Sequence, residues 1–507
     1  MYSKGNEKSA FTRKAGLFLL LCSAYYFFIG RDSGVVESST SKDWAKSPKV
    51  LAKSMTEEQL DQFPPEAFSY IAMIDAGSSG CRAHVYRYGV LGHEAGPLYV
   101  LPKHDSLKVK PGLSSFKSSP SQAGPSLEGL ITFLKSKVPV DQWATTPIYL
   151  KATAGLRLVT DAERQAILSS VRQYLADKTV SPFAFHSGDA EVISGIEEGA
   201  FGWISVNYLK QTIGPFKPTV AVNKDSAFAV IEMGGASTQV TQVAKTAHDE
   251  FMIEDGYKYP FMTQNERLVL YSHSYLGYGA DKAREGLSSH LASRTAPSTA
   301  LADPCLNPGY AKPVGMQHSS IYEGISSHEI IGKGNDELCH SEVEAAMFSK
   351  RHGGVDAKCH RDTTTVSFDC IHQPSFVRKS ENILVFENFF YTASAVGTMP
   401  ANHEANPAAK SGFPLHTSPK EFLDSAQEVC SVPWDSMNTR YPREPSQNSR
   451  WCFSTTYAYL FLTHGIGLAD DHAITVQQSI GSADVEWALG ATYKELSDEL
   501  ERHRKQV

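Results

Sequence analysis

The chain has 507 residues, of which 41% are hydrophobic and 20% are charged, and its formal net charge is -7 at pH 7. This length exceeds what one hydrophobic core usually covers, so we expect two folded units with accessory segments. Nucleic acid is excluded as a partner by the acidic balance and the lack of basic clusters, because phosphate backbones bind grouped lysines and arginines.

A charge-free stretch, "AGLFLLLCSAYYFFIG", runs from Ala15 to Gly30. As a helix it would be about 24 Å long, which suits a thin early-secretory bilayer. Basic residues precede it, so the positive-inside rule predicts a cytosolic tail over 1–14 and a type II membrane anchor over 15–30. Cys22 and Ala24 also form a small-x-small site, so a cleaved signal peptide and a secreted protein are the alternative.

The segment over 31–65 is polar and serine-rich, which predicts a flexible stem. Six cysteines lie in the second half of the chain, and their spacings do not resemble zinc knuckles. We therefore expect disulfides, which agree with a lumenal, oxidising compartment. Among the pairings that six cysteines allow, Cys359–Cys370 and Cys430–Cys452 are the local closures.

Two segments share one plan. Near Phe68 an apolar strand begins that ends at Asp75, and a turn of small and hydroxyl residues leads to a second strand from Arg82 to Tyr88. The stretch "FAVIEMGGASTQVTQV" repeats this order with its acid at Glu232. The pattern predicts two β-hairpins, and the repetition indicates duplicated lobes.

The turns of both hairpins have the composition of anion-binding nests. Their glycines let backbone N–H groups approach an oxyanion, and their hydroxyls add donors. Taken singly, such a turn is more often only a turn, but the pair favours phosphate binding. Because Asp75 and Glu232 would repel phosphate, an acid beside each turn implies a divalent cation between acid and phosphate.

A strand from Ile148 to Ala152 is followed by a small-residue turn at Thr153 and then by a helix. Thr160 and Glu163 form a capping box at the start of that helix. The alternation of strand and helix predicts an α/β architecture. Thr153 then lies at the carboxyl end of a strand, where ligands of α/β folds collect.

Glu197 and Glu198 fall within a helical stripe of apolar residues and are bracketed by Gly195 and Gly199. The simplest interpretation is that both glutamates face water. Each helix-interior glycine costs about 1 kcal/mol relative to alanine, so we expect another backbone or a ligand to approach closely there. One of the two glutamates is then a candidate general base.

Five motifs in order resemble the conserved regions of the apyrase family of nucleoside tri- and diphosphate diphosphohydrolases, which includes the Golgi guanosine diphosphatases. They are DAGSSG at 75–80, ATAGLR at 152–157, GIEEGAFGW at 195–203, MGGASTQ at 233–239, and WCFSTTYAYLFLTHGIGL from 451 with WALGATY from 487. The resemblance runs from about Phe68 to the C-terminus. The phrases KPGLSSF and SHSYLGYGADKAR resemble the Golgi diphosphatase branch in particular.

The resemblance implies an α/β fold of two ribonuclease H-like lobes, as in the actin, sugar-kinase and heat-shock ATPase superfamily, with a nucleotide cleft between them. We assign 66–194 and 481–507 to lobe I and 195–480 to lobe II. The implied reaction is direct attack of water on the terminal phosphate, without a phosphoenzyme.

Carried over by position, the resemblance makes Glu198 the catalytic base. The residues implied to hold and orient the attacking water are Thr153, Ser237 and Gln239. Asp75 and Glu232 would hold the waters around a Ca²⁺ or Mg²⁺ ion, with Mn²⁺ as a third candidate. The implied phosphate cradle is Ser78, Ser79, Gly80, Gly234, Gly235 and Ala236. Tyr391 would stack on the base, with Trp451 or Arg450 on its other face.

Two positions depart from the family pattern. Cys81 stands where the family commonly has Thr, Ser or His, so either a phosphate-contacting hydroxyl is lost or the thiol is a small core residue. Glu232 stands where the family favours Asp, and its extra methylene adds about 1.5 Å, a distance that would shift the cation or change which metal is accepted.

We therefore predict a metal-dependent nucleoside diphosphatase that converts GDP or UDP to the monophosphate in the lumen of the Golgi or another secretory compartment. A broader apyrase that also cleaves triphosphates is the alternative within the family. A non-catalytic, nucleotide-gated binding module is the alternative from another class, and it gives no reason for the Glu197–Glu198 region or for the anchor.

Overall fold

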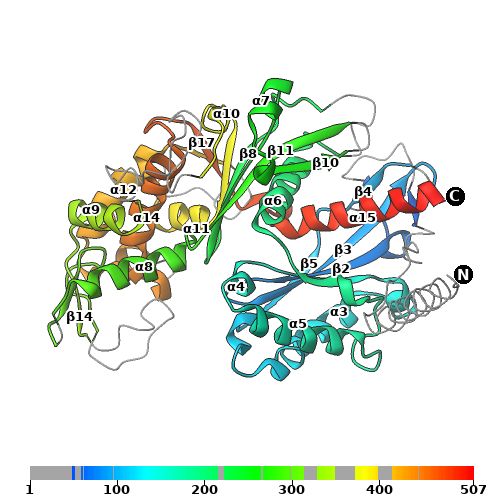
Figure 1. Cartoon of the computed structure of the whole chain (residues 1–507), viewed down its shortest axis with the longest axis horizontal. Coiled ribbons are helices and arrows are strands. Elements are labelled where there is room, and N and C mark those ends of the chain that lie inside the picture. The colour runs from blue at the N-terminus through cyan, green and yellow to red at the C-terminus, as the bar shows by residue number, and fades with distance from the viewer. Residues whose placement is uncertain are drawn as a thin grey trace, which may run out of the picture. The chain divides into compact units, whose positions relative to one another are not determined.

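The computed structural model describes residues 48–51, 59–60, 62–94, 96–214, 222–263, 266–296, 298–312, 328–348, 371–397, 414–442 and 445–506. The expected tail and anchor, most of the stem, and the expected Cys359–Cys370 pair lie outside these residues. Within them, no helix combines the length and the apolar character that crossing a bilayer requires. Two seven-stranded sheets organise the described part (Figure 1).

The first sheet has the strand order β1-β3-β2-β6-β7, with β4 and β5 also paired to β3. Its strands are β1 (Val50–Leu51), β2 (Ser69–Ala76), β3 (Cys81–Leu91), β4 (Leu98–Val100), β5 (Asp105–Val109), β6 (Ile148–Ala152) and β7 (Ala190–Val192). The predicted hairpin is β2–β3, with Asp75 opposite Arg82. The predicted strand is β6, which runs parallel to β2.

Helices α3 (Glu128–Lys137) and α5 (Asp161–Ala176) cover one face of this sheet, and the short α4 (Ala154–Arg157) follows β6. The expected capping box opens α5. The Glu163 backbone N–H donates to Thr160 Oγ1 at 3.3 Å, and the Thr160 N–H donates to Glu163 Oε2 at 2.9 Å. The turn before α4 lies between the buried strand β6 and the buried residues of α4.

The second sheet has the order β10-β11-β9-β8-β15-β17-β16. Its strands are β8 (Ala229–Met233), β9 (Ser237–Val243), β10 (Lys258–Met262), β11 (Arg267–Leu276), β15 (Ile383–Glu387), β16 (Leu415–Thr417) and β17 (Ile474–Val476). The second predicted hairpin is β8–β9, with Glu232 opposite Gln239. As β6 does beside β2, β15 runs parallel to the first strand of the hairpin. The two sheets thus repeat one plan.

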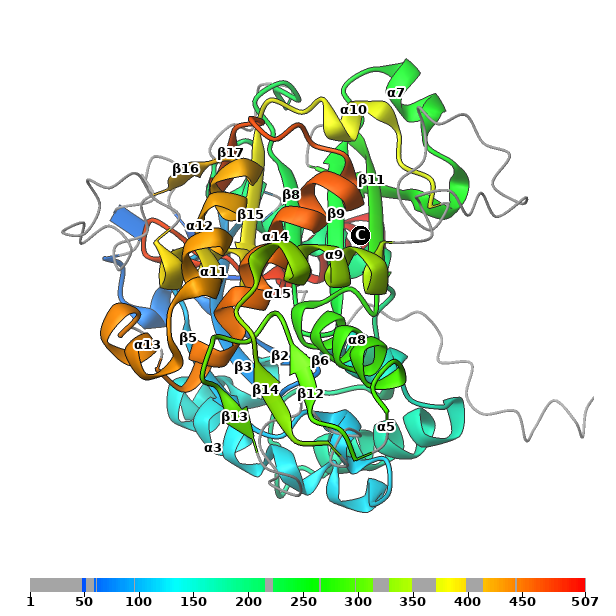
Figure 2. The ribbon, with the colours of Figure 1, turned by 90° about the vertical axis from the view of Figure 1, so that its left-hand side faces the viewer.

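A helical layer covers the second sheet, and Figure 2 shows α9, α12 and α14 in front of its strands. The helices are α7 (Ala247–Met252), α8 (Ala280–Ser293), α9 (Asp336–Met347), α10 (Ser375–Arg378), α11 (Asn388–Val396), α12 (Pro419–Ser431), α13 (Trp434–Arg440) and α14 (Trp451–Leu460). The smaller strands are β12 (Leu301–Asp303), β13 (Ala311–Lys312), β14 (Ile330–Gly332), β18 (Ser479–Ile480) and β19 (Ala483–Asp484). The expected Cys430–Cys452 disulfide is confirmed, and Cys305 pairs with Cys339.

Two helices join the halves of the described fold. Helix α6 (Gly195–Leu209) packs on β8, β9 and β11, while α15 (Trp487–Gln506) packs on β2, β3 and β4. The two helices also pack on each other so closely that a Cβ placed on Gly490 would lie 1.9 Å from the Phe201 carbonyl oxygen. Glycine is therefore required at this crossing. The lobe boundaries at 194 and 481 stay a prediction.

Candidate active site

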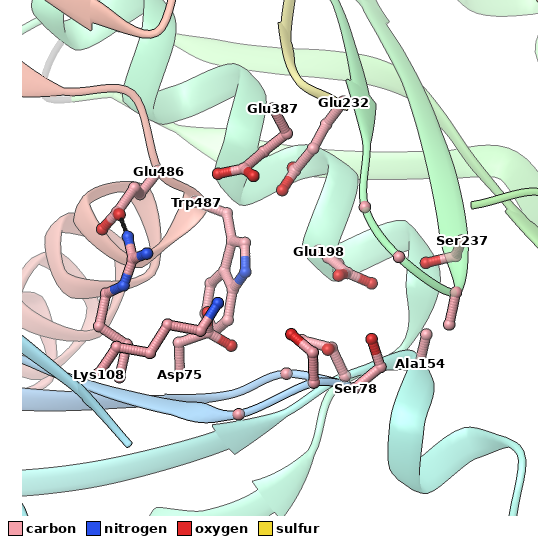
Figure 3. Close-up of a pocket in the computed structure, with 18 residues that line it drawn as sticks. Asp75, Ser78, Lys108, Ala154, Glu198, Glu232, Ser237, Glu387, Glu486 and Trp487 are labelled. Carbon is pink, nitrogen blue, oxygen red and sulfur yellow. Dashed lines mark ion pairs between the residues drawn. The ribbon is translucent and has the colours of Figure 1, made fainter. Parts of the chain in front are cut away.

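A pocket lies where the turns of the two hairpins meet the first turn of α6 (Figure 3). A Cβ placed on Gly235 would lie 3.1 Å from Ser78 Oγ, and one on Gly155 would lie 2.9 Å from the Ser78 Cα. The two predicted phosphate turns are therefore close together. The sequence-predicted residues that line this pocket are Asp75, Ser78, Ser79, Gly80, Thr153, Glu198, Glu232, Gly234, Gly235, Ala236 and Ser237.

The first turn of α6 separates the roles of its two glutamates. The Ser194 N–H donates to Glu197 Oε2 at 2.8 Å, and the Glu197 N–H donates to Ser194 Oγ at 3.2 Å. This capping box engages the Glu197 carboxylate at the helix start. Glu198 instead faces the pocket and is only 6% exposed. The Ser-x-x-Glu spacing at 194–197 is a sequence signal for this difference, and our sequence interpretation missed it.

The Glu198 carboxylate is held by two donors. Its Oε2 accepts hydrogen bonds from Arg157 Nη2 at 2.5 Å and from Gln239 Nε2 at 3.0 Å. Gln239 lies behind the pocket wall, where its Nε2 also approaches Ser237 Oγ at 2.6 Å. Burial raises the pKa of Glu198, while the Arg157 guanidinium acts in the opposite direction. The result is a buried carboxylate with a fixed orientation.

The glycines that bracket these glutamates are explained by packing. A Cβ placed on Gly199 would lie 2.6 Å from both Ser272 Oγ and Thr241 Oγ1, and one on Gly195 would lie 2.2 Å from the Ser274 Cβ. We expected a backbone or a ligand to approach here, but the approaching groups are side chains of β9 and β11. The glycines let α6 lie directly on the second sheet, and this contact sets the depth of Glu198.

Carboxylates gather on this pocket: Asp75, Glu198, Glu232 and Glu387 all line it. In the described part of the chain, Asp75 Oδ1 and Glu232 Oε2 are buried without a hydrogen-bond partner. Burial, and next to it the Glu198 charge, raise the pKa of Asp75 to about 7 and that of Glu232 well above its usual range. Buried carboxylates at such proximity need a compensating charge. An all-oxygen donor set of this kind fits Ca²⁺ or Mg²⁺.

Glu387 is a pocket residue that our sequence interpretation missed. It ends β15 with a φ of +58°, a backbone conformation that a residue with a side chain rarely adopts. Its N–H donates to Gln478 Oε1 at 2.8 Å, which holds it there. Strain of this kind collects at functional sites. The stretch "ILVFE" carried the same signal as Asp75 and Glu232, an acid that ends an apolar strand.

Two basic side chains line the pocket from the first sheet, Arg82 on β3 and Lys108 on β5. They lie opposite each other in the β3–β5 register. Arg82 forms an ion pair with Glu486, drawn as a dashed line in Figure 3. Trp487, the first residue of α15, lines the same pocket. None of these placements follows from a local sequence pattern, because each depends on pairing between distant segments.

The predicted base-binding residues do not line this pocket. Tyr391 on α11 is 45% exposed, whereas Trp451 is buried and donates its Nε1–H to Asn448 Oδ1 at 3.0 Å. Arg450 forms an ion pair with Asp281, whose Oδ2 would lie 2.7 Å from a Cβ placed on Gly235. Arg450 is therefore linked to the second phosphate turn, and base stacking stays a prediction.

Cys81 lies at the start of β3 and is 1% exposed within the core that includes Ala83 and Leu150. Of the two interpretations of this cysteine, the small core residue is the one that the structure confirms. The hydroxyl donors of the first turn are therefore Ser78 and Ser79.

Comparison with known proteins agrees with this geometry. The sequence pattern of the GDA1/CD39 (nucleoside phosphatase) family matches residues 62–505. The chain is 30% identical over 446 residues to ectonucleoside triphosphate diphosphohydrolase 2 of Gallus gallus, an alignment that covers 84% of this chain and 82% of that protein. It is also 30% identical over 453 residues to the guanosine-diphosphatase of Saccharomyces cerevisiae, covering 86% and 81% of the two chains.

Among solved structures, a nucleoside triphosphate hydrolase from Neospora caninum shares the fold with a TM-score of 0.58 at 16% sequence identity, and the match covers 86% of this chain and 94% of that one. The predicted two-lobe α/β fold and the predicted class of enzyme are both confirmed. The motifs, the paired hairpins and the comparisons lead to one conclusion: this chain belongs to the GDA1/CD39 family of nucleoside phosphatases.

Proposed function

We propose that this chain hydrolyses nucleoside diphosphates, GDP and UDP in particular, to the monophosphate and phosphate, with Glu198 as the base that activates the attacking water. The observation that carries the proposal is the Glu198 carboxylate itself, which is buried in the pocket and oriented by Arg157 and Gln239. Water is a poor nucleophile, and a carboxylate within hydrogen-bond reach orients it and accepts its proton as the bond to phosphorus forms.

The surrounding groups suit the remaining tasks. The phosphate cradle is the pair of facing turns, Ser78–Gly80 and Gly234–Ala236, whose backbone N–H groups and hydroxyls receive phosphate oxygens. Thr153 and Ser237 line the pocket together with Glu198, and hydroxyls of this kind suit the holding of the attacking water. Gln239 contacts Glu198 and Ser237, so its part is to position those groups.

Asp75 and Glu232 would hold the divalent cation through its water shell. Their unpartnered oxygens and raised pKa values fit such an occupant. When bound, Ca²⁺, Mg²⁺ or Mn²⁺ supplies positive charge that neutralises the phosphate oxygens. From the first sheet, Arg82 and Lys108 offer cationic donors to the same phosphates.

The diphosphate preference rests on relatives and motifs together. Guanosine-diphosphatases of Schizosaccharomyces pombe and Saccharomyces cerevisiae are among the similar proteins, and KPGLSSF lies next to the pocket lining at Lys108. The relative named a triphosphate diphosphohydrolase favours a second candidate, an apyrase that cleaves both tri- and diphosphates.

For the compartment we propose the lumen of the Golgi or another secretory organelle, with the anchor at 15–30. The two disulfides support an oxidising environment.

Phosphate release from GDP, UDP, ADP, GTP and ATP, with Ca²⁺ or with a chelator, tests the proposal directly. We expect Glu198→Gln to lower turnover by about 10²- to 10⁴-fold while nucleotide affinity stays close to normal, since the base acts in the transition state. Glu197→Gln is the matched control, because glutamine also serves in a capping box. Its turnover should stay near that of the natural chain.

Near-normal turnover in Glu198→Gln would remove this residue as the base. Absence of phosphate release from every nucleotide by the natural chain would instead favour a binding module. Equal rates with di- and triphosphates would favour the broader apyrase.

A further inference from the structure

A second cluster of titratable side chains, which the phosphatase mechanism does not use, adjoins the pocket and shares Glu486 with its lining. It consists of His84 on β3, His104 just before β5 and Glu486 just before α15. One ring nitrogen from each histidine and one oxygen of Glu486 lie within 4.8 Å of one another. The His84 side chain is fully buried, and Glu486 is only 8% exposed.

The protons of this cluster do not satisfy its acceptors. His104 Nδ1 lies 2.9 Å from the Pro102 carbonyl oxygen, which only accepts, so Nδ1 carries the proton of this ring and Nε2 keeps a lone pair. That Nε2 faces His84 Nδ1 at 3.0 Å, and Glu486 Oε2 faces the same Nδ1 at 3.2 Å. One proton on His84 Nδ1 serves only one of these acceptors. Glu486 Oε2 has no hydrogen-bond partner among the residues described.

The spacing of these atoms matches metal coordination. A tetrahedral ion with bonds of about 2.0–2.1 Å places its ligand atoms roughly 3.3 Å apart. The two measured separations from His84 Nδ1, at 3.0 and 3.2 Å, are close to that value. A cation in place of the His84 proton would be bound by all three atoms at once.

We propose that His84, His104 and Glu486 form a binding site for Zn²⁺. Imidazole nitrogens with one carboxylate are a preferred donor set for this ion, and three protein ligands leave a fourth position for water. Ca²⁺ and Mg²⁺ prefer oxygen ligands, so this site differs in chemistry from the one proposed at Asp75 and Glu232. The ion would tie β3 to the segment that leads into Trp487 and α15.

Outer contacts orient two of the three ligands as they do in metal proteins, while His84 is held by burial. The Pro102 carbonyl fixes the His104 ring, and Arg82 holds the other oxygen of Glu486. Burial lowers the pKa of both imidazoles, so both rings are neutral and offer lone pairs. The positive charge of Arg82 opposes a cation here, and the Asp484 and Asp105 carboxylates near His104 offset it.

Equilibrium dialysis of the full chain against Zn²⁺, in excess Ca²⁺ and without nucleotide, tests the site by metal content alone. We expect one retained Zn²⁺ per chain and an affinity lowered by more than about 100-fold in His104→Gln, since even an outer-contact change costs 10–100-fold. His93→Gln is the matched control, because His93 is exposed in the same half of the chain. It should retain the ion. Co²⁺ in place of Zn²⁺ should give the strong visible absorption of a tetrahedral site, and His84→Gln should abolish it.

Zinc that is not retained over Ca²⁺, or that His104→Gln holds as tightly as the natural chain, would overturn the proposal. If His84→Gln fails to fold, as circular dichroism would show, His104→Gln and the Co²⁺ spectrum of the natural chain still decide. The result is independent of catalysis. Zinc retained by a chain that releases no phosphate would contradict the proposed function and leave the zinc site standing.

Discussion

The hairpins β2–β3 and β8–β9 share a backbone plan but carry different charges. In the first, Asp75 lies opposite the cation Arg82 in the strand register, and Lys108 lies opposite Arg82 on the neighbouring strand. In the second, Glu232 lies opposite the neutral Gln239 in the strand register, and the neighbouring strand β15 ends at Glu387. The two hairpins thus share the phosphate turns and differ in the charges of their flanks. The first hairpin therefore carries cationic side chains beside its acid, whereas a further carboxylate lies beside the acid of the second.

Removing a cation that lies beside the first hairpin should have the largest effect. We expect Lys108→Gln to raise the KM for GDP by about 10- to 100-fold, because a hydrogen bond to a charged group is worth about 1.5–3 kcal/mol. Steady-state kinetics measure this directly. Lys103→Gln removes an exposed charge outside the pocket and should leave KM unchanged. An unchanged KM in Lys108→Gln would mean that the charge asymmetry has no part in substrate binding.

The two acids offer a smaller, reciprocal test. We expect Glu232→Asp to change the ratio of Ca²⁺- to Mg²⁺-supported turnover by about 10-fold, because shortening a group that holds the metal's waters alters metal affinity by 10–100-fold. The mirror change, Asp75→Glu, should shift the ratio as well. Activation curves with Ca²⁺, Mg²⁺ and Mn²⁺ would show it. Identical curves for the natural chain and Glu232→Asp would mean that the water shell absorbs the extra methylene.

The smallest expected effect concerns a histidine beside the second hairpin. Burial lowers the pKa of His273 on β11 to about 4, below the ~6.5 of a free imidazole. The unfolded chain therefore binds more protons between about pH 4 and 6.5, and the stability that is complete above this range falls as the pH drops through it.

Replacing His273 removes this proton uptake. Urea unfolding at pH 7 and pH 5 should show that His273→Phe loses about 1–2 kcal/mol less than the natural chain, after allowance for the partial exposure of the ring. His273→Gln, a second replacement that does not titrate, should reduce the loss equally. Equal acid losses in all three chains would show that the ring does not contribute to the pH dependence.

Sequence patterns were most informative where structure is local. The strand Ile148–Ala152 and the capping box of α5 follow from spacing within a few residues, and the structure reproduces both. Each hairpin was visible as two apolar runs around a small-residue turn. The choice of Glu198 over Glu197 came from family resemblance. The physical reason is that Ser194 engages Glu197, which the Ser-x-x-Glu spacing at 194–197 already indicated.

The cationic side of the pocket was hidden for a different reason. Lys108 faces Arg82 only because β5 pairs with β3, and Glu486 reaches Arg82 from the far end of the sequence. No periodicity within one segment records such pairing between segments. The same holds for His84 and His104. Neither stands out in the sequence, and they form a candidate pair of metal ligands only once β3 and the loop before β5 are adjacent.

The position of helix α15 also bears on how the protein folds during synthesis. Its Trp487 and Leu489 share one core with Met73 of β2 and Trp203 of α6. The ribosome delivers β2 early and α15 only after every other described element, so one apolar face of the nascent first sheet stays uncovered until then. Lobes usually fold as they emerge, and uncovered apolar sheets aggregate. This face of the first sheet is therefore complete only once α15 has emerged and packed on it.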